Sequence, residues 1–243
     1  MNIQHRNLAE SETSQDTIVE MSLSTAQRIL PWLSVIVVGL GVFREVYVAA
    51  FGMDTMLQGI RHFALDAENT VAAWYSSHLM SASALALLGC GLLARKSANK
   101  MAGNWFLLAA IFICLSLDES ASFHEEVSSR LQGLLDTGGI FYFAWVIPGS
   151  IFVAAVGLYF LPFLFKLQRS TALSFVLAGG MFVGGAIGME LIGGALAEGT
   201  EIRGWQYYLA ATIEETLEIA GLTLFLWALL DYLKNQTALW AFR

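Results

Sequence analysis

The sequence has little charge for its length. Only 14% of its 243 residues are Asp, Glu, Lys or Arg, and 56% are hydrophobic. A soluble domain carries about 25% charged residues, so this composition excludes an ordinary soluble fold and indicates an integral membrane protein. The chain also has no basic cluster, so we expect no nucleic-acid partner.

Cysteine is nearly absent, and so is any sign of a cleaved leader. Cys90 and Cys114 both fall in apolar runs, so we interpret them as buried thiols rather than as a disulfide. Residues 1–27 are polar and acidic, and the first apolar run is too long for a signal peptide. We therefore expect residues 1–27 to form a polar cytoplasmic tail, disordered or lying on a surface, with no cleaved signal.

Long hydrophobic runs, in contrast, are abundant. Six segments have about 20 or more mostly apolar residues, enough to cross a hydrocarbon core of about 30 Å. The sequence therefore predicts an all-α polytopic membrane protein, a six-transmembrane-helix bundle in one domain of residues 28–235, with a short cytoplasmic tail at 236–243. The predicted spans cover residues 29–51, 71–94, 104–128, 140–165, 171–196 and 205–230.

The basic residues indicate the orientation of these spans. Nine of the thirteen Lys and Arg residues fall in segments on the side of the termini, and three fall on the opposite side. Cytoplasmic loops carry the excess of Lys and Arg, so both termini are predicted to be cytoplasmic. We expect a multi-pass protein of the cell inner membrane in contact with membrane lipids. Its oligomeric state stays open.

Two spans have features that should shape the bundle. The fourth has no ionisable residue and is interpreted as scaffold, with a kink predicted at Pro148. In the fifth, Gly180, Gly184 and Gly188 recur at every fourth residue. Because stripes of small residues let helix backbones approach closely, we expect this span to pack tightly against the third and sixth.

Ionisable side chains gather in one leaflet. Five of the six predicted spans carry them, and at 1.5 Å per residue all lie within roughly 15 Å of the outer interface. Each charge in a span costs roughly 2.5–3.5 kcal/mol on insertion scales, so several together need partners, a metal ion or water. We interpret them as one polar cavity that opens to the outer leaflet. The predicted metal ligands are His78, Asp118, Glu119, His124, Glu125, Glu190, Glu214 and Glu218.

The kinds of residue in this set favour a divalent transition metal. On a continuous helix Asp118, Ser122 and Glu125 share one stripe, and Glu214 and Glu218 lie one turn apart. Crowded carboxylates repel one another unless a cation is present. Two imidazoles among them favour zinc or a di-iron pair over calcium or magnesium, although the Glu-x-x-His spacing of di-iron bundles is missing.

Several polar residues have structural interpretations as well. Arg44 and Glu45 are adjacent, so they point about 100° apart and favour structural ion pairs with different neighbours. His78 fits a hydrogen-bonded core histidine as well as a ligand. Glu215 is either a partner of Arg44 or, with Glu119, a candidate catalytic carboxylate.

Two motifs resemble segments of known membrane proteins. Residues 115–125 read LSLDESASFHE and residues 214–221 read EETLEIAG. They resemble helices of small bacterial multi-pass inner-membrane proteins of unassigned function. The resemblance covers two helices and implies no activity.

Two classes of function remain open. The first is a metal-dependent membrane hydrolase or oxidase that acts near the outer leaflet on a lipid or other small apolar substrate. The second is a cation- or proton-coupled transporter, in which the same carboxylates bind the transported cation. A transporter needs a polar route through the inner half of the membrane as well, and there the spans offer only small groups such as Ser34 and Cys90. The sequence therefore favours the enzyme.

Overall fold

The computed structural model describes residues 3–53, 57–198 and 204–241, and these residues form helices and no strand. Six helical segments are long and apolar enough to cross a membrane, which confirms the predicted all-α architecture and indicates a multi-pass membrane protein. The cytoplasmic position of the termini stays a prediction. The six segments are Met21–Phe51, Val71–Lys96, Ala102–Ala121, Val146–Leu164, Arg169–Ala197 and Trp205–Gln236.

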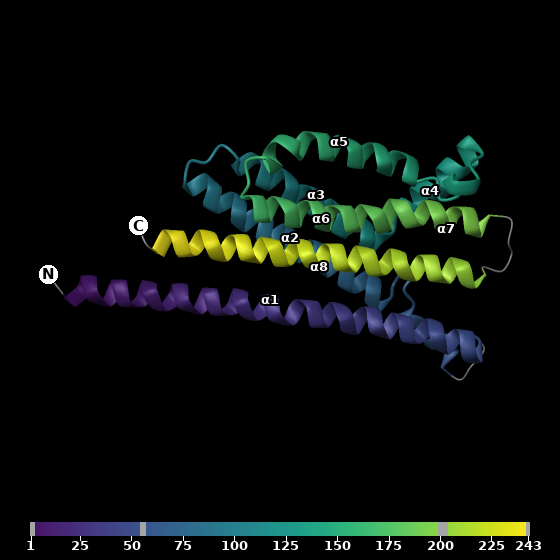
Figure 1. Ribbon diagram of the computed structural model, residues 1–243, viewed down its shortest axis with the longest axis horizontal. Coiled ribbons are helices and arrows are strands. Elements are labelled where there is room, and N and C mark those ends of the chain that lie inside the picture. The colour runs from purple at the N-terminus through teal and green to yellow at the C-terminus, as the bar shows by residue number, and fades with distance from the viewer. Residues whose placement is uncertain (1–2, 54–56, 199–203, 242–243) are drawn as a thin grey trace.

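The helices form an elongated bundle with α8 at its centre. α8 packs against α1, α2 and α6, and both ends of the chain lie at the same end of the bundle (Figure 1). The elements, in chain order, are α1 (Ile3–Phe51), η1 (Gln58–Phe63), α2 (Val71–Lys96), α3 (Ala102–Ala121), α4 (Phe123–Leu135), η2 (Gly139–Phe141), α5 (Val146–Leu164), α6 (Arg169–Val183), η3 (Gly184–Met189), α7 (Glu190–Ala197) and α8 (Trp205–Ala241).

The first helix is longer than the sequence indicated. α1 continues back to Ile3, where a disordered or surface-lying tail was predicted. The reason is local, because no Gly or Pro interrupts residues 3–30. Pro148 also differs from expectation: it lies in the first turn of α5, where a missing amide N–H breaks no helical hydrogen bond, so it does not interrupt the helix.

Hydroxyl groups join the helices inside the bundle. Ser34 of α1 is 2.8 Å from the hydroxyl of Tyr75 and 2.6 Å from that of Thr223, which links α1 to α2 and α8. Ser77 of α2 is 3.0 Å from the hydroxyl of Ser116 of α3. In a membrane the lipid is as apolar as the helix surfaces, so no hydrophobic driving force brings helices together. Contacts between small polar residues then help to hold the helices against one another.

The predicted third span, 104–128, is in fact two helices. α3 ends at Ala121 and α4 begins at Phe123, because Ser122 adopts the left-handed conformation with φ 55° and ψ 39°. The Ser122 N–H donates to the carbonyl of Asp118 at 2.7 Å. The stripe that placed Asp118, Ser122 and Glu125 on one face is therefore wrong, since it requires an unbroken helix.

The glycine repeat predicted a close helix contact but identified the wrong glycines. A Cβ atom on Gly180, Gly184 or Gly188 would meet nothing within 4 Å, whereas one on Gly185 would lie 2.7 Å from the carbonyl oxygen of Glu214. The cause is η3, a π-helical turn. A π turn widens the helix locally, so the face that meets α8 no longer follows the spacing of four residues.

Candidate functional site

One cavity of about 550 Å³ lies between α3, α5, α6 and α8. Its lining has an acidic part, at the end of the bundle opposite the termini, and an apolar part that extends toward the termini. We call the first part the acidic chamber. It is lined by Asp66, Glu68, Asp118, Glu119, His124, Glu125, Glu190, Glu214, Glu215 and Glu218.

The acidic chamber collects its side chains from five segments of the chain. The segment between η1 and α2 supplies two carboxylates, the end of α3 two, α4 one together with the imidazole, α7 one and α8 three. Among the described residues that line the cavity there is no Lys or Arg. Nine acidic side chains thus surround a single imidazole, and this charge requires bound cations or protons.

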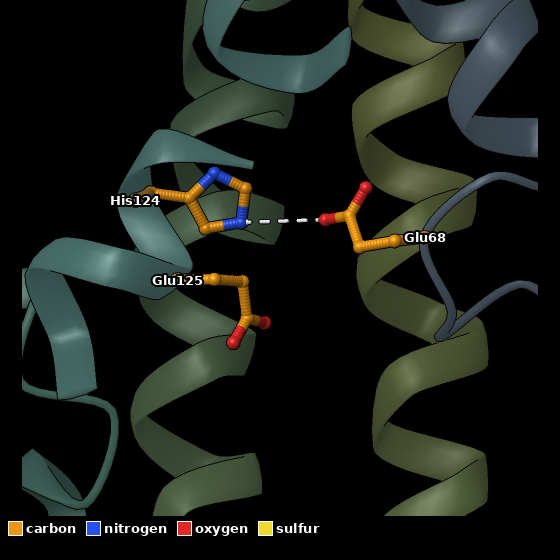
Figure 2. Close-up of side chains that lie close together, drawn as sticks. All are labelled: Glu68, His124 and Glu125. Atoms are coloured by element: carbon orange, nitrogen blue, oxygen red, sulfur yellow. Dashed lines mark ion pairs between the residues drawn. The ribbon is translucent and has the colours of Figure 1, made fainter. Parts of the chain in front are cut away.

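Asp118 fixes the orientation of His124. One carboxylate oxygen of Asp118 accepts the backbone N–H of His124 at 3.0 Å, and the other lies 3.0 Å from Nδ1 of the ring. The opposite ring nitrogen, Nε2, points toward Glu68 and lies 3.8 Å from its Oε1 (Figure 2). In metal-binding histidines, the ring nitrogen that does not bind the metal is usually held by a carboxylate, which is the arrangement of Nδ1 and Asp118 here.

Glu68, His124 and Glu125 form a candidate ligand group. Each offers one ligand atom, and these three atoms lie within 4.8 Å of one another. Figure 2 shows that the three side chains extend toward a shared space from two different segments, the one before α2 and the start of α4. The break at Ser122 makes this possible, because it lets α4 begin beside the end of α3.

The imidazole of His124 is strongly influenced by its neighbours. Burial lowers its pKa, but the hydrogen bond to Asp118 and the charges of Asp118, Glu125 and Glu68 outweigh burial and raise the pKa from 6.5 to about 8. The metal-free ring is therefore mostly protonated at neutral pH, and an ion that binds Nε2 must displace that proton.

A second carboxylate group lies where α7 meets α8. Glu190 is the first residue of α7, and its Oε1 accepts a hydrogen bond from Nε1–H of Trp145 at 2.9 Å. Its carboxyl group is also within hydrogen-bonding reach of Glu214 on α8. The Trp145 ring lies 5.5 Å from the ring of His124, so one side chain contacts both groups.

Glu119 and Glu215 are charged neighbours of these two groups. Glu119 interacts electrostatically with Glu68 and His124 of the first group. Glu215 interacts with Glu119 and Glu68, and with Glu190 of the second group. Glu215 is therefore within electrostatic range of both candidate ligand groups, and Glu119 is within range of the first.

Comparison with protein families identifies the family of the chain. The model of a domain of unknown function, DUF8692, matches residues 30–233. The chain belongs to the DUF8692 family. The match includes the whole acidic chamber, and it supports the resemblance to uncharacterised proteins with several apolar helices. No curated protein and no solved structure matches the chain.

Most of the predicted site residues of this DUF8692 member do share one cavity. The exception is His78, which is exposed on α2 and does not line the cavity. Its Nδ1 lies 2.7 Å from the carbonyl oxygen of Trp74, and its ring lies 4.3 Å from that indole. The expectation of two imidazoles in the site is therefore wrong, because the buried face of α2 is formed by other residues. The residues brought together are Asp118, Glu119, His124, Glu125, Glu190, Glu214, Glu215 and Glu218.

Arg44 and Glu45 lie outside this cavity. Arg44 is buried, pairs with Glu45 at 2.7 Å and donates from Nε to the carbonyl oxygen of Gly59 at 3.3 Å. Arg44 and Glu45 thus pair with each other and not with the different neighbours that the sequence favoured, because long side chains of adjacent residues can fold back toward each other. The hydrogen bond from Arg44 to Gly59 attaches η1 to α1. Glu215, the other predicted partner of Arg44, lines the acidic chamber instead.

Sequence reasoning missed Asp66, Glu68 and Trp145. A signal for the first two was present, since Asp66 and Glu68 directly precede the second span on the same outer side as the other carboxylates. No comparable signal pointed to Trp145, because aromatic residues at span ends are expected at a membrane interface in any case.

Proposed function

We propose that the acidic chamber binds one or two divalent transition-metal ions and that the protein is a metal-dependent enzyme of the cell inner membrane. It would act near the outer leaflet on a lipid or another small apolar substrate, with both termini cytoplasmic. One observation carries the proposal: nine acidic side chains and one imidazole line a single cavity that has no Lys or Arg among its described lining residues.

The geometry supports a specific division of roles for a first ion. Glu68, Glu125 and Nε2 of His124 would bind it, since their ligand atoms are already grouped. Asp118, which the sequence offered as a ligand, would instead hold the His124 ring, because both of its oxygens are used by that residue. One nitrogen and two carboxylate ligands suit zinc or iron and leave a position open for water or substrate.

The second group would bind a second ion. Glu190 and Glu214 approach each other across the α7–α8 contact, and Glu218 follows one turn later on α8. An all-carboxylate group beside a His-containing group is compatible with zinc or with a di-iron pair, which bundles of this kind bind through carboxylates projecting inward.

Glu119 and Glu215 are left to act on protons. A bound ion supplies Lewis acidity toward water, oxygen or a substrate oxygen. Because both carboxylates line the same cavity as the two groups, either can accept a proton from a group held there. Glu119 is the better placed for the first ion, since it interacts with both Glu68 and His124.

The apolar part of the cavity favours an enzyme over a transporter. A transporter that carried cations or protons through these carboxylates would need polar groups that continue to the other membrane face. The cavity lining toward the termini is instead apolar, with Phe160, Phe163, Leu164, Phe175 and Phe225. Transport remains the alternative that the metal measurement below would select.

Elemental analysis of protein purified without chelators tests the proposal. We expect zinc or iron in about stoichiometric amount. His124→Ala should lose metal and unfold at a lower temperature while still forming a monodisperse protein, because it removes the only nitrogen ligand in the described lining. The matched control is His78→Ala, which removes an exposed imidazole outside the cavity and should retain the metal.

A wild-type protein without metal would overturn the enzyme proposal. The carboxylates would then be assigned to proton or cation transport. Metal that persists equally in His124→Ala and His78→Ala would place the ion elsewhere and reject the division of roles given above.

A further inference from the structure

The apolar part of the cavity has a shape of its own. We call it the apolar slot, and it continues from the acidic chamber toward the termini between α3, α5, α6 and α8. Residues that represent its four walls are Phe112 of α3, Phe152 and Val156 of α5, Val176 and Val183 of α6, and Phe225 of α8.

The slot is open on one side, between α5 and α6. Phe152 and Val176 line the cavity, yet they are 46% and 57% exposed. Both belong to helices that are long and apolar enough to span a membrane, and α5 lies at the edge of the bundle (Figure 1). The medium outside this opening is therefore the hydrocarbon of the bilayer rather than water.

The slot is closed at the end near the termini by packed aromatic rings. Trp105 is fully buried and lies edge-on to Phe163 at 4.9 Å and to Phe175 at 6.2 Å. Phe175 in turn lies 4.7 Å from Phe225. These rings join α3, α5, α6 and α8 and close this end of the slot. The described acidic side chains that line the cavity all lie at the other end, in the acidic chamber.

The length of the slot matches a single hydrocarbon chain. Gly149 and Phe163 both line the cavity and are fourteen residues apart on α5, which at 1.5 Å per residue is about 21 Å. An extended residue has three backbone bonds and spans about 3.3–3.6 Å, so an extended chain of single bonds advances roughly 1.2 Å per bond. A slot of this length therefore holds a chain of roughly 17 bonds. The cavity volume of about 550 Å³ is that of a pocket for one small ligand.

We propose that the apolar slot binds one linear alkyl chain of a membrane lipid, which enters sideways between α5 and α6 and keeps its polar head at the acidic chamber. The inference names the substrate class of the proposed enzyme and rests on that function only for the role of the head group. Binding of the chain itself requires no metal, because the slot has apolar walls throughout.

Two glycines allow the slot to be filled without disturbing the helices. Gly157 of α5 and Gly179 of α6 line the cavity, and a Cβ on either would meet nothing within 4 Å. A phenylalanine at either position meets no obstruction at its Cβ, and because both positions line the cavity we expect it to narrow the slot. Gly180 is the matched control, because its Cβ would also be unobstructed but the residue does not line the cavity.

Photo-crosslinking in lipid nanodiscs tests the inference. The probe is a neutral fatty alcohol of about 16 carbons with a diazirine near the end of its chain. We expect it to label peptides of α5 and α6 in wild-type protein, and Gly157→Phe and Gly179→Phe each to reduce this labelling by about tenfold or more. Gly180→Phe should label like wild type. Each variant is first checked for a monodisperse elution peak, and its metal content is measured in parallel.

The outcomes separate this inference from the proposed function. Undiminished labelling of both slot variants, or an equal loss in Gly180→Phe, would overturn the slot. A wild-type protein that contains metal but takes no label would also reject the slot while leaving the metal site in place. Labelling that depends on Gly157 and Gly179 in a protein free of metal would support the slot and reject the enzyme.

Discussion

Replacing Gly185 by Ala should loosen the contact between η3 and α8. The new Cβ would lie 2.7 Å from the carbonyl oxygen of Glu214 and 2.8 Å from Cγ of Glu218. The first of these contacts is with backbone, which cannot rotate away. The neighbouring Gly184 is in the same π-helical turn, but a Cβ there would meet nothing within 4 Å, so Gly184→Ala is a matched control.

The size of the effect follows from the clash. The oxygen of Glu214 is 0.7 Å closer than the 3.4 Å at which ordinary contact begins, so η3 and α8 must separate by a similar amount. Overpacking of this kind costs about 1–3 kcal/mol. Replacing a helical Gly by Ala gains about 0.5–1 kcal/mol, and both variants receive that gain. The difference between the variants therefore isolates the clash.

Thermal unfolding in detergent, followed by tryptophan fluorescence, measures that difference. At about 2–4 °C per kcal/mol for a chain of this size, Gly185→Ala should unfold roughly 2–12 °C below Gly184→Ala. Equal melting temperatures for the two variants would refute the argument that Gly185 sets the distance between η3 and α8.

Two further predictions concern the site and the topology. Asp118→Asn should weaken metal binding by about 10- to 100-fold, because it removes the charge that holds the His124 ring and keeps the shape of the side chain. Competition with a chelator measures the metal affinity. An unchanged affinity would contradict the role given to Asp118. Gly133→Cys, on α4, should react with an impermeant thiol reagent added outside the cell. The two native cysteines give little background, because Cys90 is buried and Cys114 lies in a span. Labelling only from the cytoplasm would contradict the predicted orientation of the spans in the membrane.

The membrane helices and the polarity of the site were predictable because both depend on position along the chain. Hydropathy over about 20 residues identifies a span without reference to its neighbours. Depth along a span also follows directly from residue number, and this placed Glu119, Glu190 and Glu214 at one end of the bundle. Their convergence on one cavity agrees with that expectation.

The direction in which each side chain points was less predictable. His78 has the right depth, yet it faces away from the cavity, because the rotation of α2 is set by packing that the sequence of one helix does not specify. Ser122 has an ordinary polar side chain and gave no sign of a left-handed break. Glu68 belongs to a connecting segment, to which helical periodicity does not apply.

The π-helical turn has a consequence for the evolution of the family. A π-helical turn holds about one residue more than an α-helical turn, because its hydrogen bonds run from residue i to i+5 instead of i+4. Deletion of one residue between Gly185 and Glu190 would therefore turn η3 into ordinary α-helix and leave Glu190 facing the chamber. The same deletion in the regular part of α6 would instead rotate everything that follows by about 100°. Family members that share the site should therefore tolerate one residue fewer in η3 more readily than one residue fewer in α6.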